Sequence, residues 1–174
     1  MHSPIYVVCF DPELKNGKLT KDSVSGLSDF IYSEMSHWAD YVNDNDRGWD
    51  EEEGAEYIRT QFADSNGNNL AVKDGTSITI KKIDIRNYSD RKIHEINNAL
   101  KKINVDNYLS YVHSLKGIIA QKGGAWICEV DSYGEIDEVS CLDDWIHNLN
   151  YVFNTDDENE EVKFHILKAY DYHW

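Results

Sequence analysis

The chain has 174 residues, of which 41% are hydrophobic and 12% aromatic, and its formal net charge at pH 7 is −15. This length suits a single domain that buries roughly 70% of its unfolded surface, and the apolar content excludes an intrinsically disordered chain. The charge disfavours binding to nucleic-acid phosphates or anionic lipid and favours cationic partners.

The first 63 residues predict a strand followed by two helices. The segment "PIYVVCF" (4–10) has the composition of a buried strand and is followed by turn signals. A shorter helix fits 51–63, because the acids at 50–53 are favourable against the N-terminal dipole of a helix. Between them, a 3.6-residue apolar period predicts a helix over 24–42 whose buried face holds Leu27, Phe30, Ile31, Met35 and Trp38.

The middle of the chain predicts a hairpin and then two helices, over 89–103 and 106–124. The hairpin covers "LAVKDGTSITIKKIDI" (70–85), with β-rich runs on either side of a turn at Asp74-Gly75. Its second strand runs to residue 85, and a bulge near Lys81-Lys82 is needed to bring onto one face Ile78, Ile80, Ile83 and Ile85. The first of the two helices has an apolar stripe formed by Ile93, Ile96, Leu100 and Ile103.

The last third predicts a second hairpin over 125–140, a helix over 141–153 and a closing strand over 162–174. The helix is amphipathic, and its apolar stripe holds Leu142, Trp145, Ile146, Leu149 and Val152 or Phe153. No repeat or linker divides the chain. We therefore predict one globular acidic α+β domain over 1–174, with a mixed or antiparallel sheet built from two hairpins plus terminal strands, and four to five helices.

Targeting signals and cysteine usage indicate a cytoplasmic protein. The N-terminus lacks the basic region and the long apolar run of a signal peptide, and no stretch approaches the roughly 20 apolar residues of a membrane span. The three cysteines are odd in number, and two lie in strand-like apolar runs. This pattern is typical of buried, reduced thiols.

Local catalytic and metal-binding motifs are missing from the sequence. A calcium loop starting at Asn43 would have Arg47 at a ligand position and Gly54 in place of the closing glutamate. No HExxH, GxSxG, CxxC or phosphate-binding glycine motif occurs. Asp144 and His147 share a helix face but lack a third metal ligand nearby. The sequence thus predicts no catalytic residue, no metal ligand and no cofactor.

Charge is distributed unevenly along the chain. Residues 1–72 carry 14 acids and 5 bases, residues 73–122 carry 5 acids and 10 bases, and residues 123–174 carry 13 acids and 2 bases. The basic middle contains a single tyrosine between residues 73 and 105, so it lacks the interleaved aromatics of a nucleic-acid-stacking surface. We expect solvated faces there and no direct nucleic-acid binding.

The acidic clusters are interleaved with aromatic residues, a composition typical of protein-binding surfaces. Acids at 50–53 are explained by a helix start, but the remaining clusters repel one another without helping the fold, so solubility and partner binding remain the two explanations. The residues predicted to bind a partner are Asp44, Asp46, Trp49, Asp50, Glu51, Glu52, Glu53, Glu56, Tyr57, Asp131, Tyr133, Glu135, Asp143 and Asp144.

These features predict a non-catalytic acidic inhibitor that occludes a basic, nucleic-acid-handling protein. The analogy is one of class: toxin-immunity proteins and phage-encoded inhibitors of restriction or CRISPR nucleases include small acidic α+β proteins, some of them nucleic-acid mimics. Two alternatives stay open. One is a small enzyme or metal-dependent protein whose carboxylate and histidine site is assembled from distant residues, and the other is a structural subunit.

Overall fold

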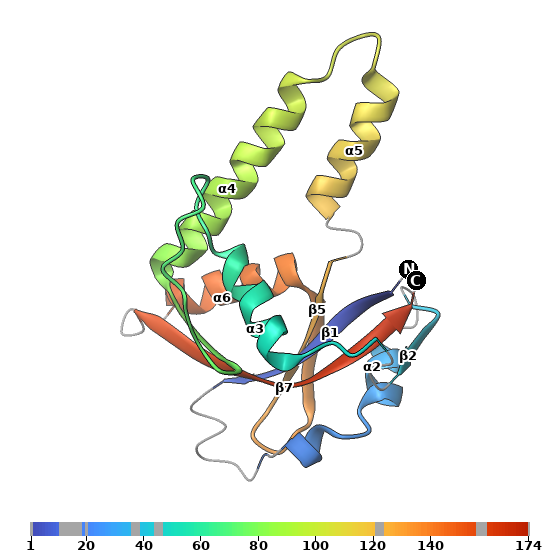
Figure 1. Cartoon of the computed structure of the whole chain (residues 1–174), viewed down its shortest axis with the longest axis vertical. Coiled ribbons are helices and arrows are strands. Elements are labelled where there is room, and N and C mark those ends of the chain that lie inside the picture. Colours follow the sequence, from blue (N-terminus) through green and yellow to red (C-terminus); the bar gives the residue numbers. More distant parts are fainter. Residues whose placement is uncertain are drawn as a thin grey trace.

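The computed structural model contains one seven-stranded mixed sheet with helices packed on both of its faces (Figure 1). It describes residues 2–10, 19, 21–35, 39–43, 47–120, 124–155 and 160–173. Five α-helices and one 3-10 helix lie within these ranges. The predicted class, a single α+β domain with four to five helices, is confirmed.

The two terminal strands form the centre of the sheet. Strand β1 (His2–Phe10) runs antiparallel to β7 (Glu161–His173) and parallel to β5 (Trp126–Val130). The sheet order is β3-β4-β7-β1-β5-β6, and the short β2 (Tyr41–Asn43) pairs with the end of β7. The remaining strands are β3 (Val72–Asp74) and β6 (Ile136–Cys141) at the two ends of this order, and β4 (Ser77–Lys81) between β3 and β7.

Alternating side chains of the central strands divide the core into two layers. In β1, Tyr6 and Val8 join one apolar cluster, whereas Ile5 and Val7 join the other, as the two-residue period of a strand requires. The first layer is covered by α3 (Glu51–Gln61), α4 (Lys82–Lys101) and α6 (Leu142–Thr155). The second layer is covered by the 3-10 helix η1 (Lys21–Val24) and α2 (Ser28–Met35).

Helix α5 (Tyr108–Ala120) packs beside α4, and the two form a hairpin that extends away from the sheet (Figure 1). Because much of this hairpin has no sheet beneath it, the apolar stripe predicted for α4 is only partly buried. Ile93 and Leu100 are exposed, whereas Ile85 and Tyr88, nearer the sheet, are buried.

The helix predicted over 24–42 is wrong in length and in its buried face. The segment instead forms η1, the eight-residue α2 and strand β2, with Gly26 at φ +85° between the two helices. Ile31 and Met35 are buried as predicted, but Phe30 is 67% exposed. Pairing of residues 41–43 with β7 prevents the helix from continuing. The predicted burial of Trp38 lies outside the described residues.

The prediction that the first hairpin extends to residue 85 is also wrong. Strand β4 ends at Lys81 and α4 begins at the next residue, so Ile83 and Ile85 are helical. The buried Asp84 carboxylate accepts a hydrogen bond from the Lys81 N–H at 2.8 Å, which satisfies one of the unpaired donors of a helix start. The cap was not predicted because the isoleucines on either side of Asp84 favour a strand.

The predictions of a second hairpin, an amphipathic helix and a closing strand in the last third of the chain are confirmed. Helix α6 buries Leu142, Trp145, Ile146, Leu149 and Phe153, and the Trp145 ring packs edge-on against Phe164 at 4.9 Å between centroids.

All three cysteines are free thiols, with Cys9 and Cys128 buried and Cys141 partly exposed. Burial raises the pKa of the Cys128 thiol to about 12, which keeps it protonated and unreactive.

Candidate functional site

The acids at the start of α3 serve the helix itself. Asp50 is the N-cap residue, and its Oδ1 accepts from the backbone N–H of Glu52 at 2.7 Å and of Glu53 at 3.0 Å. Glu51, Glu52 and Glu53 occupy the first turn, where negative charge is favourable against the helix dipole. These four predicted site residues therefore have a structural role that needs no partner.

The rest of α3 also pairs internally. The Arg59 guanidinium donates to both carboxylate oxygens of Glu56, at 2.8 and 2.5 Å, and this contact holds the pKa of Glu56 below its usual range. Glu52 lies 3.9 Å from the Lys73 ammonium. Tyr57 is exposed on the same helix. Asp44 and Asp46 lie outside the described residues.

Gly54 brings this acidic turn close to the sheet. A Cβ atom on Gly54 would lie 2.4 Å from the ring of Tyr6 on β1, so only glycine fits here. Burial, followed by the nearby charges of Tyr57, Glu53 and Asp50, raises the pKa of Tyr6 above its usual range. The α3 acids thus lie directly over a neutral, buried tyrosine.

The β5–β6 turn holds the next predicted residues. Asp131 Oδ1 accepts from the backbone N–H groups of Tyr133 at 2.8 Å and Glu135 at 2.9 Å, and Gly134 adopts φ +86°. Tyr133 and Glu135 are exposed. Asp131 therefore shapes the turn, and its two neighbours present an aromatic ring and a carboxylate to solvent.

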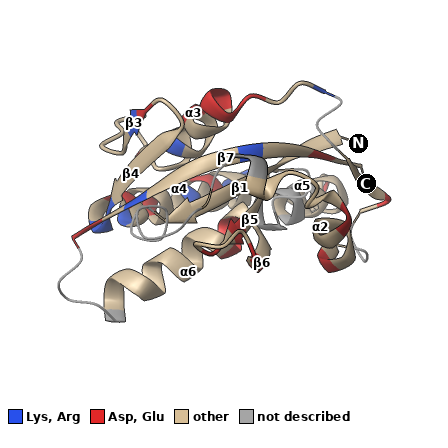
Figure 2. Cartoon of the chain, turned by 90° about the horizontal axis from the view of Figure 1, so that it is seen from below, with Lys and Arg blue, Asp and Glu red and all other residues tan. Residues whose placement is uncertain are grey.

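A groove of about 560 Å³ runs between this hairpin and α2. Its apolar lining comes from Leu27 and Phe30 of the α2 segment and from Ile136 and Val139 of β6. Its charged lining is entirely acidic and consists of Glu34, Glu135, Asp137 and Glu138. Figure 2 shows acidic residues on α2 and along β6, whereas most lysines and arginines lie on β3, β4, α4 and β7.

The groove acids are solvent-exposed and mostly unpaired. Glu138 accepts from the Asn148 amide at 3.1 and 3.0 Å. Among the residues that the structure describes, no lysine or arginine forms an ion pair with Glu34, Glu135 or Asp137. Sequence reasoning found Glu135 but missed Glu34 and Asp137, because no local pattern shows that α2 lies beside β6.

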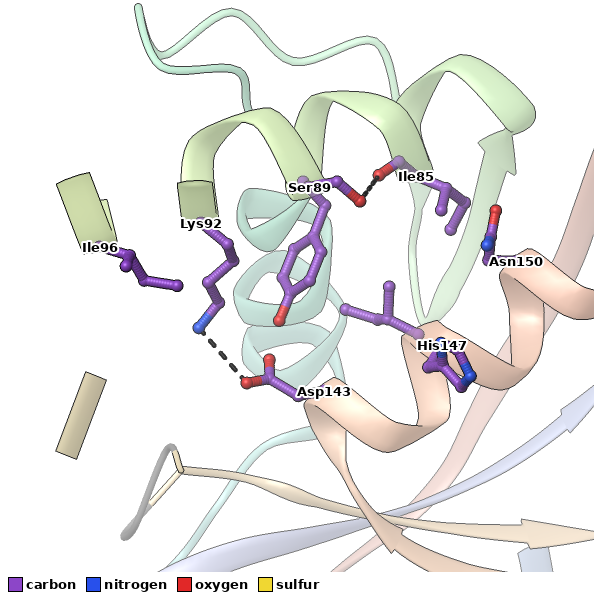
Figure 3. A pocket seen from close by; sticks show the side chains of 9 residues that line it. Ile85, Ser89, Lys92, Ile96, Asp143, His147 and Asn150 are labelled. Atoms are coloured by element: carbon purple, nitrogen blue, oxygen red, sulfur yellow. Dashed lines mark hydrogen bonds and ion pairs between the residues drawn. The ribbon is translucent and has the colours of Figure 1, made fainter. Parts of the chain in front are cut away.

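The last two predicted residues, Asp143 and Asp144, lie in the first turn of α6, where Asp144 is exposed and Asp143 is partly buried. Asp144 accepts from the Cys141 thiol at 3.1 Å and is exposed. Asp143 lies 3.4 Å from the Lys92 ammonium of α4 and faces a pocket of about 280 Å³ between the two helices (Figure 3). The pocket lining also includes Ile85, Tyr88, Ser89, Ile96, Ile146, His147 and Asn150.

The charged groups of this pocket are partly desolvated. Burial, together with the Asp144 charge, raises the pKa of Asp143 to about 6, and burial lowers the pKa of Lys92. The Tyr88 hydroxyl and Asp143 Oδ1 are buried, and neither has a hydrogen-bond partner within the described ranges. Tyr88 and Lys92 were not predicted, because they lie about 50 positions from Asp143 in the sequence.

Two histidine–carboxylate pairs meet where the two ends of the chain enter the sheet. His2 Nδ1 lies 2.8 Å from Asp171 Oδ2, and His173 Nδ1 lies 3.0 Å from Asp40 Oδ2. The imidazole centroids are 5.1 Å apart, and Tyr41 stacks on His173 at 5.3 Å. Sequence reasoning missed the pairs because they join residues 169 and 133 positions apart.

Trp49, another predicted site residue, is anchored to this cluster. Its indole Nε1 lies 3.5 Å from Asp171 Oδ1, and its ring packs against the apolar core. The fully buried Asp171 carboxylate therefore has partners on two sides. Trp49 holds the segment before α3 to the sheet.

No protein-family model, no curated protein and no solved structure matches this chain. Within the described part of the chain, no three His, Cys, Asp or Glu side chains are grouped so that they would hold a metal ion. The same residues include no helix with the length and apolarity of a membrane span.

Proposed function

We propose that the protein is a cytoplasmic, non-catalytic binding protein that occludes a basic partner, and that it does so through the groove between α2 and β6. The observation that supports this is the composition of the groove: apolar side chains with an exclusively acidic rim. Folding does not account for this combination, because the exposed rim carboxylates repel one another.

The groove has the makeup of a protein-binding surface. An exposed ring, Phe30, stands beside carboxylates that steer a cationic partner and shape its specificity. Strand β6 is the last strand in the sheet order. Within the described residues no strand pairs with its outer edge, so an extended segment of a partner would add to the sheet there. A basic, partly apolar, extended segment of a partner would match the exposed ring, the carboxylates and the open edge of β6.

The partner class follows from the charge. Proteins that handle nucleic acids present lysine and arginine to phosphate groups, and an acidic protein that covers those residues excludes the substrate. We propose a toxin nuclease or a restriction or CRISPR nuclease as the target. The acids of α3 add to the long-range attraction, although they also stabilise their helix.

The first test removes charge from the groove. The variant Glu34→Gln, Glu135→Gln, Asp137→Asn loses three carboxylates there, and the control Asp74→Asn, Asp90→Asn, Asp106→Asn loses the same charge from exposed positions elsewhere. Each protein is titrated with a basic peptide of about ten residues that alternates Lys and Leu. We expect affinity to fall about tenfold or more in the groove variant and much less in the control.

The second test concerns inhibition. Affinity capture from the source cell with wild type should recover a basic protein in a 1:1 complex, and the groove variant should lose it. The nuclease activity of that protein should fall to background at equimolar inhibitor. An acidic partner, full activity in the complex, or equal capture by the groove variant would contradict the proposal.

A second candidate function, acid–base catalysis, is favoured by the histidine pairs. Each Nδ1 is engaged by a carboxylate, which orients the imidazole and leaves Nε2 as the atom that exchanges protons with a substrate. Hydrolysis of bis(4-nitrophenyl) phosphate by wild type, lost in both His2→Asn and His173→Asn, would support this candidate. Equal rates in all three proteins would remove it.

A further inference from the structure

The pocket between α4 and α6 contains two charges of opposite sign beside apolar walls. The Lys92 ammonium and the Asp143 carboxylate are 3.4 Å apart, and their side chains are only 16% and 25% exposed. Ile85, Ile96 and Ile146 supply the apolar lining. In Figure 3, Lys92 on α4 and Asp143 on α6 point toward each other across the pocket.

Two polar atoms in this pocket lack partners. Tyr88 is 7% exposed, yet its hydroxyl has no hydrogen bond among the described residues, and the same holds for Asp143 Oδ1. A buried polar group left unsatisfied costs about 1–3 kcal/mol. By contrast, the Ser89 hydroxyl, which also lines the pocket, donates to the Ile85 carbonyl at 3.0 Å. A ligand that satisfied Tyr88 and Asp143 would recover this cost.

The charges restrict the kind of ligand. A simple anion would meet the Asp143 carboxylate, and a simple cation would meet the Lys92 ammonium, so each gains one contact and suffers one repulsion. A molecule with both charges a few ångströms apart gains two attractive contacts. The carboxylate of such a molecule would accept from Lys92 and from the Tyr88 hydroxyl, and its ammonium would donate to Asp143 Oδ1.

We propose that this pocket binds a small zwitterion, an α-amino acid with an aliphatic side chain, paired head to tail with Lys92 and Asp143. The aliphatic side chain packs against the three isoleucines, where each buried methylene contributes about 0.8 kcal/mol. The pocket volume of about 280 Å³ is enough for an amino acid and too small for a folded segment.

This inference is independent of the proposed function. The pocket residues Ile85 and Ile146 belong to the apolar layer of α3, α4 and α6, whereas the groove residues Leu27 and Val139 pack against the layer of η1 and α2. The two sites therefore lie on opposite faces of the sheet, and either one can fail its test without affecting the other.

The test is a calorimetric titration of the full chain with L-leucine and three analogues, each lacking one feature. 4-Methylpentanoate lacks the ammonium, 3-methylbutylamine lacks the carboxylate, and glycine lacks the side chain. We expect saturable binding of L-leucine below about 1 mM and at least about tenfold weaker binding of every analogue. Absence of L-leucine binding up to about 10 mM, or equal binding of any analogue, overturns the proposal.

Variants assign the binding to this pocket. Tyr88→Phe removes the hydroxyl but keeps the ring, so L-leucine affinity should fall about tenfold, while the thermal stability of the ligand-free protein should rise because the unsatisfied hydroxyl is gone. Asp143→Asn should weaken binding at least as much. Ser89→Ala is the control and should bind like wild type, because that hydroxyl is already used by the helix.

The pH profile gives a second readout. Since the pKa of Asp143 is raised to about 6, the carboxylate that receives the ammonium is ionised at pH 8 and largely protonated at pH 5. L-leucine affinity should therefore fall between these values in wild type. Affinity that is independent of pH, or equal in Tyr88→Phe and wild type, would place the ligand elsewhere and overturn the assignment.

Discussion

The first turn of α3 and the groove between α2 and β6 each carry four carboxylates, but the fold uses them differently. Asp50 caps α3, its three neighbours lie at the favourable end of the helix dipole, and Glu52 approaches Lys73. Among the residues that the structure describes, Glu138 is the only groove carboxylate with a hydrogen-bond partner, and that partner is Asn148. Charge density alone does not identify the carboxylates that stabilise the fold; the contacts of each carboxylate do.

The two regions also differ in how visible their acidic residues are in the sequence. The α3 acids are consecutive and obvious, whereas the groove acids are split between a helix and a strand about 100 positions apart. A helix N-terminus favours a contiguous acidic run. Such a run should therefore be interpreted first as a helix start and only then as a binding surface.

The largest expected effect concerns the helix that forms one wall of the groove. Ile31→Ala should lower the free energy of unfolding by about 2–5 kcal/mol, because Ile31 is fully buried. Phe30→Ala should change it by less than about 0.5 kcal/mol, because Phe30 faces the groove. Urea denaturation measures both. A loss in Phe30→Ala as large as in Ile31→Ala would show that Phe30 belongs to the core and is unavailable to a partner.

The next effect tests how tightly the α3 acids are held against the sheet. Gly54→Ala places a methyl group into the Tyr6 ring and should cost about 1–3 kcal/mol of overpacking, partly offset by the higher helix propensity of alanine. The melting temperature should therefore fall. Thr60→Ala, at an exposed position of the same helix, is the control and should stay near wild type. A rise in melting temperature for Gly54→Ala would mean that α3 sits farther from β1.

A direct comparison of the two acidic regions comes from one substitution in each. Asp50→Ala removes the N-cap and should cost about 1 kcal/mol, whereas Asp137→Ala in the groove should stay within about 0.5 kcal/mol of wild type. Asp50→Asn keeps a capping oxygen and should recover most of the loss. Chemical denaturation reports all three. Equal losses in the two alanine variants would show that the α3 acids contribute no more to stability than the groove acids do.

The last test uses pH to examine Asp143, which belongs to neither region. Its pKa is raised to about 6, so the folded state binds a proton that the unfolded state has lost, and this contribution to stability disappears as pH rises from about 4 to 6. Asp143→Asn cannot titrate. The stability of the variant relative to wild type should therefore increase over this window, as urea midpoints at several pH values would show. A constant difference would mean that Asp143 is solvated.

Local sequence signals determined the elements whose stability is local. The stripe of α6, the β5–β6 hairpin with its turn at 132–134, and the capped start of α3 follow from helical period, turn chemistry and capping, which act within a few residues. The two terminal strands were also predicted. Residues 4–10 form the continuous apolar run typical of a central strand, whereas residues 162–173 intersperse β-rich apolar residues with polar ones such as Lys163, His165 and Lys168.

Tertiary contacts determined the secondary structure of two segments whose local preferences favoured a different element. Ile83 and Ile85 are β-branched and favour a strand, but the cap from Asp84 and packing against the α6 layer make residues 82–85 helical. Tyr41 and Val42 continue an apolar helical period, but pairing with β7 makes residues 41–43 a strand. At residues 82–85 a local cap together with long-range packing, and at residues 41–43 long-range strand pairing, outweigh propensities of less than about 1 kcal/mol per residue.

Only the tertiary structure assembled the candidate sites. Glu34 and Asp137 line one groove, Lys92 and Asp143 line one pocket, and His2 and Asp171 form one pair because strand order and helix packing bring distant segments together. The sequence by itself determined that the protein is acidic, apolar enough to fold and free of local catalytic motifs. The cap of α3 is local, but which distant carboxylates come to lie side by side depends on long-range contacts that no local pattern encodes.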